Sequence, residues 1–123
     1  MNITWFIVIA FMPIVCLSAG LILKKIATSE PNSLIGYRTR RSSSSQQTWN
    51  YANSLASKIF FGIGIFTLLT GIFTLVLLRN STEQRLETWM VTHLYLSVGL
   101  LFGTLPIIEM NLRKKYDKNG KEK

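Results

Sequence analysis

Three long runs of apolar residues divide this 123-residue chain, and none of them contains Asp, Glu, Lys or Arg. They cover residues 3–23, 59–78 and 88–108. Because an α-helix rises about 1.5 Å per residue, a run of about 20 residues spans roughly 30 Å, the thickness of the bilayer hydrocarbon core. Backbone amides in lipid must be satisfied within the segment, so each run is predicted to be a transmembrane helix.

The expected fold class is therefore all-α, a polytopic membrane helix bundle with three transmembrane helices. The composition agrees, since 48% of the residues are hydrophobic, only 16% are charged, and almost all charges lie between or after the apolar runs. We expect a single domain over residues 1–123, with a cytoplasmic loop at 24–58 that continues into the second helix and a cytoplasmic tail at 109–123.

The basic residues predict how the bundle is oriented. Twelve of the fourteen Lys and Arg residues lie in the 24–58 loop or in the tail, whereas the opposite side holds only Arg79 and Arg85. By the positive-inside rule, the N-terminus is expected outside and the C-terminus in the cytoplasm of a cell (inner) membrane protein. We interpret the net charge of +8 as this topology signal. The predicted partners of the basic segments are anionic lipid head groups rather than nucleic acid.

The 24–58 loop is the unusual part of the chain, because the other connection, 79–87, has only nine residues. Loops of this length are either functional or disordered. Three arginines, Arg38, Arg40 and Arg41, can bind phosphate or carboxylate groups bidentately. Further on, Ser44 and Gln47 have the spacing of a helix capping box, which predicts that a helix starts there and leads into the second span.

This loop also carries a family resemblance. Residues 31–39 read PNSLIGYRT and residues 48–53 read TWNYAN. The order and spacing of these residues resemble the signature of the SdpI family of bacterial membrane proteins, here in a short, three-span form, from Asn32 to about Ile65. The resemblance marks as functional positions Asn32, Gly36, Arg38, Thr39, Trp49 and Asn53. With Tyr37, Arg40 and Arg41, they form the predicted partner- or lipid-binding loop.

The resemblance implies an immunity role. The named family member protects its producer from a secreted, membrane-active peptide toxin and holds a transcriptional repressor at the membrane. The expected function is thus an integral membrane immunity or signalling protein, with a peptide toxin and a cytoplasmic regulator as expected partners. The alternative is a small accessory subunit of a larger bacterial membrane complex.

The loop chemistry suggests more specific roles. Gly36 allows a tight backbone, and Asn32 and Asn53 can pin the loop to the start of the helix. Arg38 is expected to bind lipid phosphate or a partner carboxylate, and the self-contained alternative is a pair with Glu109 at the end of the third span.

The spans themselves contain little chemistry. Among Asp, Glu, His, Lys and Arg they contain only His93, and we expect it to make an interhelical hydrogen bond or a water contact. Four glycines, Gly64, Gly71, Gly99 and Gly103, are predicted to allow close helix packing within the monomer or in a homo-oligomer. The sequence contains no nucleophile with a base, no phosphate-binding glycine loop and no metal-ligand cluster. We therefore expect a protein that is not an enzyme and binds no cofactor or metal.

Overall fold

The computed structural model describes residues 3–123 and contains three helices in this part of the chain, with no β-strand. They are α1 (Ile3–Ile26), α2 (Gln46–Leu77) and α3 (Glu83–Lys115). All three are long and apolar enough to cross a membrane. The predicted all-α fold class is confirmed. α2 and α3 are longer than the apolar runs within them, because α2 begins before residue 59 and α3 ends after residue 108.

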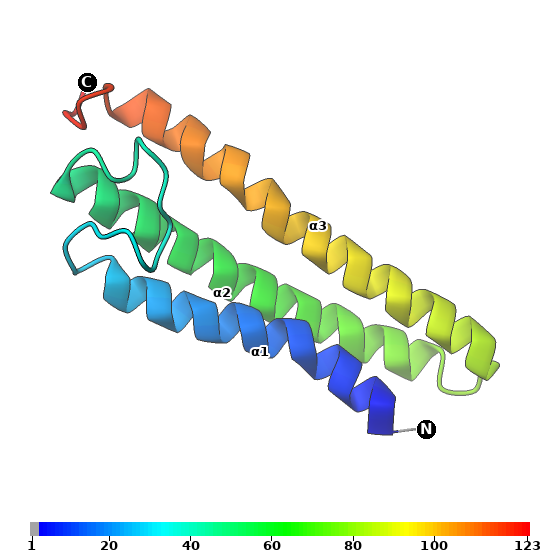
Figure 1. Cartoon of the computed structure of the whole chain (residues 1–123). Coiled ribbons are helices and arrows are strands. Elements are labelled where there is room, and N and C mark those ends of the chain that lie inside the picture. Colours follow the sequence, from blue (N-terminus) through cyan, green and yellow to red (C-terminus); the bar gives the residue numbers. More distant parts are fainter. Residues whose placement is uncertain (1–2) are drawn as a thin grey trace.

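The helices run antiparallel in chain order, and α2 lies between α1 and α3 (Figure 1). The long α1–α2 loop and the C-terminus meet at one end of the bundle, which we call the loop end. The short α2–α3 connection and the start of α1 lie at the other end, which we call the turn end. At the turn end, an apolar cluster joins all three helices through Ile9, Leu75, Leu86 and Met90.

Many large apolar side chains point outward. Phe73, Leu96 and Phe102 are each more than 60% exposed in the isolated chain. A water-soluble bundle rarely exposes large apolar side chains in such numbers, whereas lipid solvates them without cost. The outer surface of the helices is therefore suited to contact with lipid tails.

α2 starts with a complete capping box formed by Ser45 and Thr48. The Ser45 hydroxyl accepts a hydrogen bond from the Thr48 amide, and the Thr48 hydroxyl accepts one from the Ser45 amide at 3.0 Å. The prediction that Ser44 caps the helix was wrong by one residue. The Ser44 hydroxyl instead donates to the Arg41 carbonyl.

The four glycines assigned to helix packing fall into two pairs. Gly64 and Gly71 are buried against α1, and a Cβ at either position would approach an α1 side chain to 3.0 Å or less. Gly99 and Gly103 lie on an open face of α3, where a Cβ would meet no described atom within 4 Å. The GxxxG pattern of α3 therefore does not pack against another helix within the described chain.

His93 joins α3 to α2 near the turn end. Its Nε2 atom lies 2.7 Å from the Thr70 hydroxyl, which in turn donates to backbone carbonyls of its own helix. The interhelical hydrogen bond that we predicted for His93 is present. A second polar link joins α2 to α1, because the Ser57 hydroxyl donates to the Gly20 carbonyl at 2.6 Å.

Candidate functional site

The loop between α1 and α2 is folded back onto the bundle, and we call residues 27–45 the loop cap. It covers the loop end and passes between α2 and α3 (Figure 1). Regular secondary structure is absent from these residues, which form turns and bends. A few backbone hydrogen bonds within its turns and many side-chain hydrogen bonds hold its conformation, and most of the predicted site residues take part in the side-chain bonds.

Asn53 and Trp49 anchor the loop cap from the first turns of α2. Both side chains are fully buried. The Asn53 Oδ1 atom accepts from the Tyr37 amide at 2.7 Å, and its Nδ2 atom donates to the Trp49 carbonyl at 3.0 Å. The Trp49 indole donates to the Ile26 carbonyl at the end of α1 at 3.0 Å. These bonds tie α1, the loop cap and α2 together.

Gly36 lies against this anchor, where any side chain would be strained. Its φ of +112° is a conformation that residues with a side chain rarely adopt. A Cβ at this position would also lie 2.8 Å from Ile26 Cγ2 and 2.9 Å from Asn53 Oδ1. Glycine therefore permits both the backbone turn and the close approach of the loop cap to the helices.

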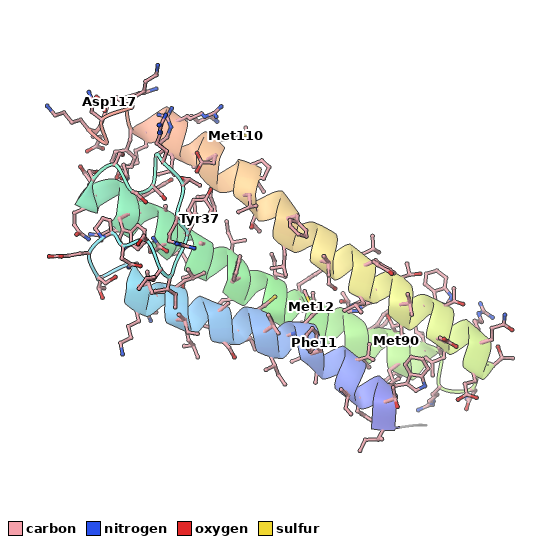
Figure 2. The ribbon with its side chains drawn as sticks, in the orientation of Figure 1. Phe11, Met12, Tyr37, Met90, Met110 and Asp117 are labelled. Atoms are coloured by element: carbon pink, nitrogen blue, oxygen red, sulfur yellow. The ribbon has the colours of Figure 1, made fainter. Side chains whose placement is uncertain are left out.

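Tyr37 extends from the loop cap to α3 (Figure 2). Only 8% of the residue is exposed, and its hydroxyl donates to Glu109 Oε1 at 2.9 Å. The same hydroxyl lies 3.4 Å from the Leu105 carbonyl. Burial, together with the hydrogen bond and negative charge of Glu109, raises the pKa of the Tyr37 hydroxyl well above its usual value of 10.0. Tyr37 is therefore a neutral hydrogen-bond donor near neutral pH.

A chain of buried hydroxyl groups supports the turn after Tyr37. The fully buried Ser42 hydroxyl accepts from the Thr39 amide at 2.8 Å and bonds the Tyr37 carbonyl at 3.1 Å. The Ser42 carbonyl accepts from the Thr48 hydroxyl at 3.0 Å. Thr39 was a predicted site residue, whereas Ser42 and Thr48 were not singled out. The four consecutive serines at 42–45 look like a flexible connection in the sequence, and only the fold shows that Ser42 is buried.

Asn32 and Arg38 lie at the exposed edge of the loop cap. Asn32 Oδ1 accepts from the amides of Leu34 and Ile35, so this side chain stabilises its own turn. The expectation that it pins the loop to the helix was wrong, since that role belongs to Asn53. The Arg38 guanidinium donates to the Ser33 carbonyl.

The pair that we considered between Arg38 and Glu109 is not formed in this structure. The Glu109 carboxylate accepts instead from the Tyr37 hydroxyl. Arg38 is exposed, so its guanidinium remains accessible from outside the bundle.

Arg40 and Arg41 face the end of α3 and the C-terminal tail. Together with Glu109, Arg113 and Lys118 they line a cavity of about 490 Å³. Arg41 also donates to the Tyr116 carbonyl at 3.3 Å. The tail is folded onto the loop cap, an arrangement that the sequence reasoning missed. In the described chain, no group of three His, Cys, Asp or Glu residues is placed to hold a metal ion.

Three membrane-crossing helices and an ordered polar loop define a small multi-pass α-helical membrane protein. Comparison with known families identifies it further. The SdpI/YfhL protein family matches residues 28–110, so this chain belongs to that family. The family resemblance predicted from the loop is confirmed.

A curated relative covers a shorter region. The chain is 40% identical over 47 residues to "Uncharacterized protein YfhL" of Bacillus subtilis (strain 168). The aligned region is 38% of this chain and 43% of the length of that relative. No solved structure matches this chain significantly.

Proposed function

We propose that this chain is an SdpI-like immunity or toxin-sensing protein that responds to a membrane-active peptide. Family membership supports the class of function. The observation that carries the proposal is the hydrogen bond from Tyr37, in the family segment of the loop cap, to Glu109 of α3. It connects a polar surface outside the membrane to a helix that contacts lipid.

The proposed mechanism follows from this connection. A peptide that inserts into the bilayer meets the exposed apolar side chains of α3, such as Leu96 and Phe102. If the peptide shifts α3 away from α2, Glu109 moves from Tyr37 and the bond breaks. The loop cap then loses the bond from Tyr37 to α3 and presents a different surface to a cytoplasmic regulator. The signal requires two arrangements of the loop cap whose populations the peptide biases.

This mechanism places the loop end in the cytoplasm, with the N-terminus outside. The distribution of Lys and Arg supports that orientation. It can be tested with single cysteines at Ser81 and Lys123 in a Cys16→Ser background, labelled in intact cells by a membrane-impermeant maleimide. Labelling of position 81 and protection of position 123 are expected, and the reverse pattern would contradict the mechanism.

The function is tested by deleting the gene in its native strain and challenging the cells with the strain's own secreted peptides. We expect the deletion strain to lose resistance and the wild-type gene to restore it. Tyr37→Phe, which removes only the hydroxyl that bonds Glu109, should restore it poorly. Leu34→Ala is the matched control, because Leu34 lies in the same loop cap but is 85% exposed. If the deletion strain survives as well as its parent, the immunity proposal fails.

The open glycine face of α3 favours a second candidate, an accessory subunit of a larger membrane complex or a homo-oligomer. Gly99 and Gly103 could allow close approach of a helix from another chain. The double variant Gly99→Leu, Gly103→Leu, purified in mild detergent, should then form a smaller assembly than the wild-type protein. Gly62→Leu provides the control, since Gly62 also has no neighbour within 4 Å but lies on α2. A wild-type particle that is already monomeric would argue against this candidate.

A further inference from the structure

The cavity between the loop cap and the end of α3 has an unusual set of charges. Four of its five lining residues are basic, namely Arg40, Arg41, Arg113 and Lys118, and the fifth is Glu109. The lining therefore carries an excess of three positive formal charges. Its volume of about 490 Å³ falls within the range typical of small-ligand sites, roughly 300–1,000 Å³.

The loop side of this cavity is held in a fixed conformation. Ser42 follows Arg41 directly and is completely buried, with its hydroxyl bonded to the Thr39 amide and to the Tyr37 carbonyl. Arg41 is itself bonded to the Tyr116 carbonyl. The backbone that carries the two loop arginines therefore does not need to be ordered by a ligand, which lowers the entropic cost of binding.

The tail side is also held in place. Tyr116 is only 2% exposed, and its ring packs edge-on against Tyr51 of α2 with 5.6 Å between the ring centroids. Beyond it, the Asp117 carboxylate accepts from the amides of Asn119 and Lys121, forming the turn that carries Lys118. The Gly120 carbonyl accepts from the Ser45 hydroxyl at 2.9 Å. The basic residues are thus presented by two structured walls.

The position of the cavity along α3 indicates the depth in the bilayer at which its ligand would lie. The uncharged run of α3 ends at Ile108, and Glu109 follows it directly. Arg113 lies about one turn further on, in the last turn of the helix. A cavity at this level lies at the boundary between hydrocarbon and water, where the phosphates of lipid head groups are found.

We propose that this cavity binds a phosphate group supplied by the head group of an anionic phospholipid. Arginine guanidinium groups bind phosphate oxygens through paired charge-assisted hydrogen bonds. The site would also bind loop, α3 and tail to one lipid molecule and so fix the loop cap at the membrane surface. The proposal does not depend on the immunity function, because it concerns the purified protein and lipid alone.

The test uses the purified full chain in non-ionic detergent micelles that contain either phosphatidylglycerol or phosphatidylcholine. Bound lipid is counted by native mass spectrometry, and thermal unfolding is followed in parallel. We expect phosphatidylglycerol to be retained and to raise the unfolding temperature more than phosphatidylcholine. A third arm adds inorganic phosphate to the phosphatidylcholine micelles.

Two double variants distinguish binding in the cavity from general electrostatic attraction between the protein and anionic lipid. Arg40→Gln with Arg113→Gln should weaken phosphatidylglycerol binding roughly thirtyfold, since each basic residue near an anionic head group contributes about fivefold. Lys24→Gln with Lys25→Gln is the control, because it removes the same charge from the loop end of α1, outside the cavity. An equal loss in both double variants would overturn the proposal.

Glu109→Gln tests the site through a gain of binding, which a misfolded protein would not show. It removes the negative charge from the cavity while retaining an oxygen that can accept from Tyr37, so phosphatidylglycerol should bind more tightly. Weaker binding in this variant would contradict the assigned site. If inorganic phosphate alone gives the full stabilisation, and this gain disappears in the Arg40 and Arg113 double variant, the lipid assignment is overturned in favour of a soluble phosphate ligand.

Discussion

The fully buried Asn53 offers the most direct test of how the loop cap is held. Asn53→Ala removes the acceptor of the Tyr37 amide at 2.7 Å and the donors to two carbonyls. A buried amide left without an acceptor costs about 1–3 kcal/mol, and the space vacated by the side chain adds about 1 kcal/mol. We therefore expect the free energy of opening the loop cap to fall by about 3 kcal/mol, which raises the population of the open state roughly a hundredfold.

Amide hydrogen exchange in detergent, read by mass spectrometry on peptides covering the loop cap, measures this change. Exchange at Tyr37 and its neighbours should accelerate by roughly a hundredfold in Asn53→Ala. Asn32→Ala is the matched control, because Asn32 is exposed and bonds only within its own turn. It should accelerate exchange less than about tenfold. Equal effects of the two variants, with helix content unchanged by circular dichroism, would refute the distinction between anchor and local turn.

Three further outcomes are expected in stability measurements of the purified chain. Gly36→Ala should lower the free energy of unfolding by about 2–4 kcal/mol, because of the positive φ and the close contacts around this position. Gly62→Ala should leave it unchanged or raise it slightly, because a Cβ at Gly62 meets no neighbour within 4 Å. Trp49→Phe should lower the free energy of unfolding by about 1–2 kcal/mol, because it removes the indole hydrogen bond and opens a space, while Ser29 still donates to the Ile26 carbonyl. Since the pKa of Tyr37 is raised on folding, its contribution to stability is complete below pH 10.0 and is lost as the pH rises toward the folded value. This alkaline loss should be smaller in Tyr37→Phe when stability is measured as a function of pH, and an unchanged profile would contradict the assignment.

The helices were predictable because lipid leaves few alternatives. A charge-free run of about 20 residues cannot leave its amides unpaired in hydrocarbon, so the number and approximate positions of the helices follow from where these runs lie in the sequence. The start of α2 was predicted to within one residue. The error arose because the capping box uses Thr48, whose hydroxyl replaces the Glu or Gln side chain of the usual pattern.

The contacts of the loop cap were less predictable, because they join residues far apart in the chain. Tyr37 and Glu109 are separated by 72 positions, and nothing local to either residue specifies the other. Turn residues fix the backbone over a few positions, but the surface that a turn meets depends on how the helices pack. For the same reason, the glycine pattern showed that α3 permits close packing but not that Gly99 and Gly103 would lie open.

Apolar packing joins the helices at both ends of the bundle, but the loop end adds buried hydrogen bonds of the loop cap to it. This addition is why we expect a response to begin at the loop end. At the turn end the helices meet mainly through apolar side chains such as Ile9 and Met90, which lipid tails could solvate almost as well, with the His93–Thr70 hydrogen bond nearby. At the loop end, buried bonds of Asn53 and Tyr37 have no substitute in hydrocarbon, and the nearby charges face water and head groups. A change in α3 position or in bound anion alters these directional bonds first, because a hydrogen bond weakens steeply with misalignment whereas apolar contact does not. We therefore expect the loop cap to respond before the rest of the bundle to a change in the membrane beside it.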